Sequence, residues 1–241
     1  MFCTSFFDIG SEAYSSRWNR WLDYYMPRMR CLGADRIFII DDGSSPGNIN
    51  LNVSIVDADR ALPANIPEGV VVFRFQEHLG RQSVFCFPGW WRSFTYCCQI
   101  AKAYSFCKII HIESDAFVLT GRMASYISSL SDGWTALWCP RYKRPETAIQ
   151  VICSDSLSIL EKYYHAGIAL WSKRVCAELV LPFSRVESHF IGDRYGEYTS
   201  IIPDGADFSA QTTLHMSLPR QLKAQARGEE GVAGDAQPLG T

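Results

Sequence analysis

Three short segments in which nearly every residue is apolar limit the fold of this chain more than any other feature of its sequence. Residues 36–40 read RIFII, residues 70–75 read VVVFRF, and residues 108–112 read KIIHI. None of them alternates polar with apolar residues, as a strand with one solvent-facing side does. Strands of this kind are buried on both faces, which is typical of a parallel sheet covered by helices.

Patterns with helical periodicity lie between the apolar segments. Residues 16–31 predict a helix that gathers bulky apolar side chains on one face. These side chains are Trp18, Trp21, Leu22, Tyr25 and Met29. We also expect helices at 90–105, 175–181 and 207–218, and strands at 2–7, 135–139, 148–153 and 166–171. This alternation predicts an α/β fold with a mainly parallel, mixed central sheet that is flanked by helices.

The length and composition of the chain fit one large domain. It has 241 residues, of which 47% are hydrophobic and 13% aromatic, and this is enough to bury a substantial core. Residues 219–241 are rich in Gly, Ala and Gln and contain no aromatic residue. We therefore expect one domain over residues 1–218 and a flexible tail over residues 219–241.

Charge and cysteine content argue against several classes of protein. A net charge of −2 gives no general basic field for nucleic acid. Nine cysteines without any Cys-x-x-Cys pair argue against a zinc ribbon or a dithiol site, and favour reduced cysteines in the cytoplasm. The sequence shows no signal-peptide pattern and no run of about 20 apolar residues, so we expect no transmembrane segment. The arginines of residues 16–31 leave peripheral membrane contact as a minor alternative.

Acidic residues follow two of the apolar segments. Asp41 and Asp42 come directly after residues 36–40, and Glu113 and Asp115 come after residues 108–112. Ligands bind beyond the carboxyl ends of the strands in an open parallel sheet. Side chains two positions apart in an extended chain point to the same side, so Glu113 and Asp115 can act on one ligand. One or two carboxylates together with substrate phosphates are the usual ligands of Mg²⁺, and Mn²⁺ accepts the same oxygen donors.

The remaining candidates are cations and a second pair of acids. Asp41 and Asp42 can accept hydrogen bonds from a ribose or a base. Arg81 and Arg92 lie between the two acidic pairs, and a guanidinium group suits phosphate oxygens. An ordinary surface ion pair is the alternative for each arginine. His111 lies within an apolar strand and is expected to be a core residue.

The order of these segments resembles that of nucleotide-sugar-dependent glycosyltransferases of the GT-A fold. IIDDGSS resembles their nucleoside-binding segment, and ESD stands in the place of their Asp-x-Asp metal motif, with glutamate first. YYHAGIALWSK resembles a strand that often reads Asn-Ala-Gly, with His165 in place of the asparagine, and GADFSAQTTL resembles an acid-led helix near the acceptor. The resemblance extends over residues 2–215.

This resemblance implies transfer of a sugar from a nucleoside-diphosphate donor, with UDP as the expected nucleotide, to a hydroxyl of a glycan, a lipid-linked molecule or a protein. Glu113 and Asp115 would bind Mn²⁺ or Mg²⁺, with His215 near the place of a histidine that completes some of these metal sites. Asp207, then Asp193, then Glu197 are candidates for the general base of an inverting reaction. A retaining reaction would need no such base. Donor-binding residues would be Thr4, Asp41, Asp42, Arg81, Arg92 and Ser114.

Two other functions remain open at this stage. A sugar-nucleotide nucleotidyltransferase has a similar sheet, but it would normally carry a glycine-rich loop with a basic residue after the first strand. The corresponding segment here reads SFFDIGSEAYSS and has one glycine. A catalytically inactive nucleotide-sugar sensor or scaffold would keep the binding segments and lack turnover.

Overall fold

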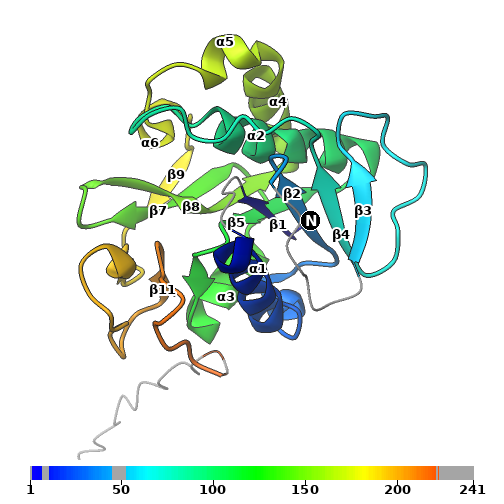
Figure 1. Ribbon diagram of the computed structural model, residues 1–241. Coiled ribbons are helices and arrows are strands. Elements are labelled where there is room, and N and C mark those ends of the chain that lie inside the picture. Colours follow the sequence, from blue (N-terminus) through cyan, green and yellow to red (C-terminus); the bar gives the residue numbers. More distant parts are fainter. Residues whose placement is uncertain (1, 7–10, 45–52, 221, 223–241) are drawn as a thin grey trace, which may run out of the picture.

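The computed structural model describes residues 2–6, 11–44, 53–220 and 222, with side chains from Ser16 onward. Eight strands form one mixed sheet in the order β3-β4-β2-β1-β5-β8-β7-β9 (Figure 1). The first five of these strands are mutually parallel, whereas β8 runs antiparallel to both β5 and β7. The predicted α/β fold with a mixed central sheet and flanking helices is confirmed.

The described elements have the following bounds. Strands of the main sheet are β1 (Phe2–Phe6), β2 (Ile37–Asp41), β3 (Val53–Asp57), β4 (Val70–Arg74), β5 (Lys108–Ile112), β7 (Trp134–Cys139), β8 (Arg144–Cys153) and β9 (Arg185–Glu187). A smaller sheet consists of β6 (Phe117–Val118), β10 (Gly192–Asp193) and β11 (Phe208–Ser209). The α-helices are α1 (Ser11–Tyr25), α2 (Pro88–Ala103), α3 (Gly121–Ser129), α4 (Leu157–Ala166), α5 (Ile168–Trp171) and α6 (Ala177–Val180). Short 3₁₀ helices are η1 (Met29–Leu32), η2 (Ser154–Ser156) and η3 (Tyr195–Glu197).

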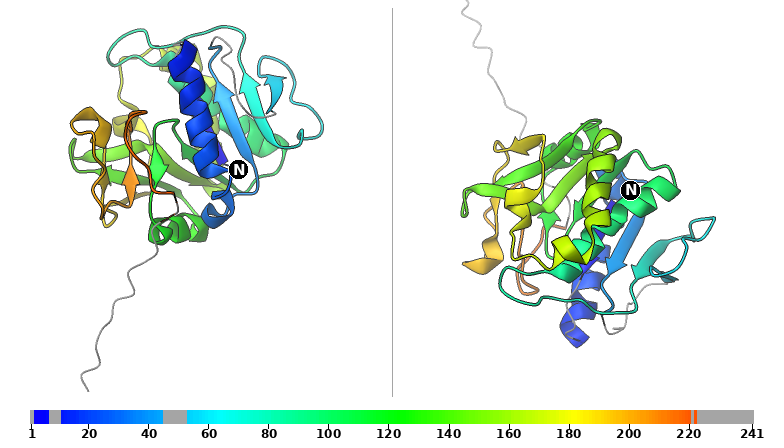
Figure 2. Two further views of the ribbon diagram at one scale, coloured as in Figure 1. Left: turned by 60° about the horizontal axis from the view of Figure 1, so that its bottom comes forward. Right: turned by 90° about the horizontal axis from the view of Figure 1, so that it is seen from above.

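The apolar strands divide the core into two layers, one on each face of the sheet. Ile37 and Ile39 of β2 pack into one layer, and Phe38 and Ile40 pack into the other. Helices α1 and α3 cover the first face, and α2, α4 and α5 lie over the second (Figure 1). The left view of Figure 2 shows α1 lying over the sheet. Strands apolar at nearly every position are therefore buried on both sides, as the sequence predicts.

Strand order creates a natural binding position at one edge of this sheet. The chain builds β2 and β4 on one side of β1 and then places β5 on the other side. A reversal of this kind in a parallel sheet leaves a crevice beyond the carboxyl ends of the two strands that flank it. Glu113 and Asp115 follow β5 directly, so they lie at this reversal.

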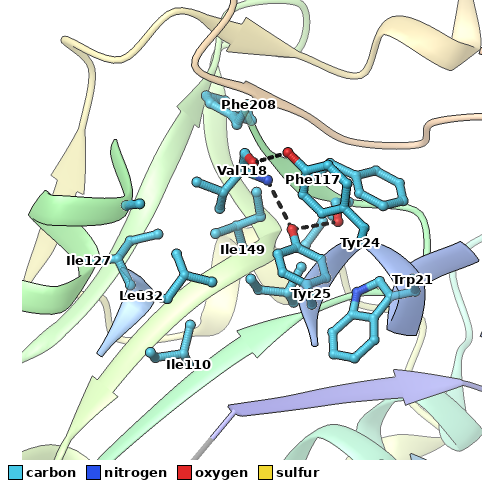
Figure 3. Packing of buried hydrophobic residues seen from close by; sticks show 14 of the residues in the cluster. Trp21, Tyr24, Tyr25, Leu32, Ile110, Phe117, Val118, Ile127, Ile149 and Phe208 are labelled. Carbon is cyan, nitrogen blue, oxygen red and sulfur yellow. Dashed lines mark hydrogen bonds between the residues drawn. The ribbon is translucent and has the colours of Figure 1, made fainter. Parts of the chain in front are cut away.

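Hydrogen bonds from α1 hold the segment that follows Asp115. The Tyr24 hydroxyl donates to the Val118 carbonyl at 2.7 Å, and the Tyr25 hydroxyl donates to the Ala116 carbonyl at 3.1 Å (Figure 3). The Tyr25 oxygen also accepts from the Val118 N–H at 2.9 Å. The rings of Tyr24 and Phe117 meet edge to face. Helix α1 and the strand end that carries Glu113 and Asp115 are thus fixed to each other.

Three expectations about elements are wrong. Residues 166–171 are helical, because α4 ends at Ala166 and α5 follows after Gly167, which has a φ of +55°. Residues 207–218 form β11 and turns in place of a helix, because Phe208 and Ser209 pair with both β10 and β6. Residues 16–31 form the end of α1 and the separate η1, with Pro27 between them.

Two further expectations concern the C-terminal tail and membrane-spanning helices. Most of the expected tail, residues 221 and 223–241, lies outside the described residues, so that prediction stays untested. Within the described part of the chain, no helix has the length and apolarity that crossing a membrane requires.

Candidate active site

Glu113 and Asp115 are positioned by backbone hydrogen bonds at the end of β5. The Glu113 N–H donates to the Ala148 carbonyl of β8 at 2.9 Å, and the Ala116 N–H closes a turn onto the Glu113 carbonyl at 3.0 Å. The Asp115 carbonyl accepts from the Thr212 N–H at 2.8 Å. Two carboxylates are therefore held at the strand end by neighbouring strands and loops.

Glu113 is half-buried, and desolvation makes its charge unfavourable. Desolvation raises the pKa of Glu113 to about 8, and the nearby carboxylates of Asp115 and Glu146 add to the rise. The Trp90 indole N–H donates to Glu113 Oε1 at 2.7 Å and partly opposes it. Glu113 thus retains a proton at pH values where an ordinary glutamate is ionised.

Asp115 has one oxygen near a cation and one without a partner. It is 9% exposed, and its Oδ2 lies 3.7 Å from Arg17 Nη1. Its Oδ1 is buried and has no hydrogen-bond partner among the described residues. Burial raises the pKa of Asp115, and the positive charge of Arg17 opposes this shift. An orphaned buried carboxylate oxygen is a group that a bound cation would satisfy.

A third carboxylate nearby is paired with an arginine. Glu146 is fully buried and forms a two-pronged ion pair with Arg194, with Nε–Oε2 at 2.7 Å and Nη2–Oε1 at 3.0 Å. Its Oε1 also accepts from the Ala148 N–H at 3.0 Å. Glu146 therefore adds negative charge beside Glu113 while its own oxygens are engaged.

These residues fit a cation that is shared with a ligand. In the described part of the chain, no group of three or more His, Cys, Asp and Glu side chains is arranged to hold a metal alone. His215 is exposed and does not complete such a group. Glu113 and Asp115 provide two hard oxygen donors, and Mg²⁺ sites commonly take the rest from water and substrate phosphates.

Asp42 and Arg92 are brought together, but as partners of each other. Both are buried, and Arg92 Nη2 donates to Asp42 Oδ1 and to the Glu77 carbonyl. Asp42 Oδ2 accepts from the Gly80 N–H at 2.7 Å and from the Leu79 N–H at 3.2 Å. This network joins the end of β2 to the start of α2, and it engages the groups that the sequence assigns to the donor.

The other predicted donor-binding residues are dispersed. Asp41 is buried, with its Oδ1 accepting from the Ser44 N–H at 3.3 Å and its Oδ2 3.4 Å from Arg74 Nε. Arg81 is exposed and donates to the Ser83 carbonyl at 3.1 Å. Ser114 is buried between the two carboxylates. Thr4 lies in β1 opposite Ile39, and its side chain is outside the described residues.

Asp207 is occupied by hydrogen bonds and does not cap a helix. It is 2% exposed and accepts from Thr120 Oγ1 at 2.6 Å, from Arg122 Nε at 3.2 Å and from the Ile191 N–H at 2.8 Å. Arg122 Nη2 also donates to it. These bonds fasten the chain around β11 to the start of α3, so Asp207 holds the fold beside the site.

Asp193 is linked to Glu146 through the next residue, Arg194. It is half-buried and directly precedes Arg194, the partner of Glu146. Asp193 Oδ2 accepts from the Tyr198 hydroxyl at 3.0 Å, and its Oδ1 accepts from the Arg194 N–H at 2.9 Å. Glu197 accepts from the Tyr142 hydroxyl at 2.6 Å.

Sequence reasoning misses four residues that surround the carboxylate pair. They are Arg17, Trp90, Glu146 and Arg194. The sequence could have pointed to two of these residues. Trp90 lies near the start of α2, the helix that leads to β5, and Arg17 belongs to the arginine-rich first helix. Glu146 and Arg194 reach the site only because β8 returns antiparallel to β5. No local sequence pattern predicts that β8 pairs antiparallel with β5.

Comparisons with known proteins give limited information. No protein-family model matches the chain, and a search of curated proteins finds no significant match. A similar solved structure is a glycosyltransferase involved in the glycosylation of the major capsid of PBCV-1. It is 12% identical, with a TM-score of 0.48, and the similarity covers 87% of this chain and 90% of that chain. A similarity at this level assigns neither a family nor an activity.

Proposed function

We propose that this protein is a metal-dependent glycosyltransferase that moves a sugar from a nucleoside-diphosphate donor, UDP-linked, to a hydroxyl acceptor. One observation carries the proposal. Two desolvated carboxylates, Glu113 and Asp115, lie at the strand-order reversal of the parallel part of the sheet, and Asp115 Oδ1 is buried with no hydrogen-bond partner among the described residues. A cation shared with a diphosphate would satisfy that oxygen and offset the negative charge.

In this account, Glu113 and Asp115 would hold Mn²⁺ or Mg²⁺. Such a cation stabilises the negative charge that develops on the leaving diphosphate. The Trp90 N–H orients the Glu113 carboxylate, and the ion pair with Arg194 partly offsets the charge that Glu146 would direct at the donor's phosphates. During transfer, the bond between the sugar's anomeric carbon and the diphosphate breaks, and a bond to the acceptor oxygen forms. In an inverting reaction the acceptor proton would pass to Asp193, because Asp193 is half-buried whereas Asp207 is only 2% exposed.

The experiment is a thermal-shift screen of UDP, other nucleoside diphosphates and their sugar conjugates, with Mn²⁺ or with EDTA. A ligand that binds only the native state raises its stability by mass action. We expect UDP and a UDP-sugar to raise the melting temperature with Mn²⁺, and Asp115→Asn to lose this shift. Asp23→Asn, at an exposed position of α1, is the control and should respond like the wild type. A shift that is the same with EDTA, or the same in Asp115→Asn, would overturn the proposal.

A nucleotide-sugar-binding protein without turnover is the second candidate. It is favoured by the hydrogen bonds that engage both base candidates, Asp193 and Asp207. Hydrolysis of the UDP-sugar identified by the screen separates the two functions. In the absence of an acceptor, glycosyltransferases slowly transfer the donor's sugar to water and release UDP. UDP release that requires Mn²⁺ supports the transferase, and binding without any release supports the second candidate.

A further inference from the structure

We propose that Arg17 of α1 binds the diphosphate of the donor. This inference rests on the proposed function, because it assigns a ligand-binding role at the Glu113 and Asp115 site. Arg17 would take the phosphate-binding role that the sequence predicts for Arg92. It acts as a positively charged side chain that receives phosphate oxygens once a cation is bound.

The position of Arg17 is the first support. Its Nη1 lies 3.7 Å from Asp115 Oδ2, which is an ion-pair distance but longer than a hydrogen bond. The Arg17 side chain remains 36% exposed, so it is accessible to a ligand as well as close to Asp115. On the other side of the same carboxylate, Oδ1 has no partner among the described residues. A cation on Oδ1 and a guanidinium beside Oδ2 would flank a diphosphate.

The rigidity of α1 is the second support. Tyr24 lies seven positions, or about two turns, after Arg17, so both side chains project from the same face of the helix. The hydroxyls of Tyr24 and Tyr25 bond to the backbone at Ala116 and Val118, directly after Asp115 (Figure 3). These tethers fix the helix over the strand end, so Arg17 is held beside Asp115 by more than its own ion pair.

The other arginines near the site are engaged elsewhere. Arg92 is 7% exposed and is bound to Asp42. Arg194 is bound to Glu146 and also to Glu178 at 2.9 Å. Arg20 Nη1 donates a hydrogen bond to the Thr213 carbonyl, and Arg20 Nη2 donates one to the Met216 carbonyl. Among the described side chains, Arg17 is the cation that forms an ion pair with the Glu113 and Asp115 pair.

Charge balance is the third support. The Asp115 carboxylate forms an ion pair with Arg17, and the Glu146 carboxylate forms one with Arg194. A diphosphate adds further negative charge, which the cation alone would have to offset. The planar guanidinium of Arg17 adds a positive charge with two parallel N–H donors, a geometry that matches two phosphate oxygens. Binding requires only that these donors turn from Asp115 toward the ligand.

The test measures binding of UDP and of inorganic pyrophosphate, each with Mn²⁺, by titration calorimetry. We compare the wild type with Arg17→Gln and Arg17→Lys. The control is Arg30→Gln, which removes a solvent-exposed ion pair with Asp35. We expect Arg17→Gln to weaken both ligands by 10- to 100-fold and Arg17→Lys to weaken them less. The control should bind like the wild type.

A second readout separates ligand binding from a structural role. Removing the positive charge beside Asp115 should leave Mn²⁺ binding in the absence of nucleotide unchanged or tighter, as measured by electron paramagnetic resonance. A structural role would weaken Mn²⁺ and diphosphate together. If Arg17→Gln binds UDP and pyrophosphate within twofold of the wild type, Arg17 has no such role while the proposed function stands. If the wild-type protein binds neither ligand with Mn²⁺, both proposals fail.

Discussion

The surroundings of Glu113 make its ionised form unfavourable. Burial and the adjacent carboxylates of Asp115 and Glu146 raise its pKa to about 8 from an ordinary 4.5, and the Trp90 N–H recovers only part of the cost. Such a group weakens the metal-free fold at neutral pH. Functional sites often contain residues of this kind, because a ligand later offsets the charge.

The pH dependence of stability follows from this shift. Between about pH 4.5 and 8 the unfolded chain ionises Glu113 while the folded protein keeps its proton, so stability falls as pH rises through this range. Glu113→Gln removes this dependence. In urea unfolding with EDTA, we expect the wild type to lose roughly 1 kcal/mol per pH unit relative to Glu113→Gln. Glu68→Gln, at an exposed position, should follow the wild type. Parallel curves for wild type and Glu113→Gln would contradict the assigned shift.

Arg92 makes buried contacts within the fold that the sequence does not predict. It is buried, bonded to Asp42 and the Glu77 carbonyl, and its guanidinium lies 4.1 Å above the Phe75 ring. Arg92→Ala would leave Asp42 charged and buried without its partner. We expect a loss of about 3–5 kcal/mol in the free energy of unfolding. Arg81→Ala, at an exposed position, should change it by less than about 0.5 kcal/mol. Equal stabilities in urea would place Arg92 outside the core network.

The site residues show what sequence can and cannot predict. Glu113 and Asp115 are predicted because their spacing after an apolar strand is a local feature, and the structure places both at the strand end. Asp42 and Arg92 have the right residue types, but only the fold reveals that they satisfy each other. Asp207 is similar, since its partner Arg122 belongs to a helix that the sequence pattern does not announce.

At the scale of elements, the start of α2 connects the two acidic pairs. Gly89 lies against Asp42, and the next residue, Trp90, donates to Glu113. A Cβ atom at position 89 would come 2.0 Å from Asp42 Oδ2 and 2.9 Å from the Gly80 nitrogen. The Gly89 N–H also donates to the Gly80 carbonyl at 3.0 Å. The absence of a side chain therefore permits this helix start to pack on the carboxylate.

Gly89→Ala tests this close approach. We expect a loss of about 1–3 kcal/mol in the free energy of unfolding, because the added methyl group must displace Asp42 or the backbone. Gly205→Ala is the matched control, since an added Cβ there has no neighbour within 4 Å. It should be neutral or slightly stabilising. The account of α2 fails if both variants unfold at the same urea concentration.

The elements differ in how well their sequences predict them. The bounds of the continuously apolar strands β2, β4 and β5 are predicted within one or two residues, because burial on both faces gives a sequence pattern without polar alternation. Very short strands are not predicted from the sequence. Strands β6, β10 and β11 have two residues each, and they form only because they pair with segments distant in the sequence. The apolar segment 166–171 is predicted to be a strand although it is helical. A short apolar segment is compatible with a buried strand and with a buried helix, so periodicity does not distinguish the two.

At the scale of the whole molecule, the site is assembled from separate parts of the chain. Arg17 comes from α1, Trp90 from α2, Glu113 and Asp115 from the end of β5, Glu146 from β8 and Arg194 from the segment after β10. Sheet order brings them to one edge, where the parallel half meets its antiparallel return. The fold class is predictable from strand patterns, whereas this convergence depends on strand order and register.

The most direct test of the central claim measures Mn²⁺ binding by electron paramagnetic resonance, with and without UDP, in the wild type and in Asp115→Asn. If Glu113 and Asp115 hold a cation against a diphosphate, UDP must strengthen Mn²⁺ binding, and Mn²⁺ must strengthen UDP binding by the same factor. We predict at least a tenfold gain in the wild type and none in Asp115→Asn. Mn²⁺ binding that does not respond to UDP, or that is equal in both proteins, would contradict the account.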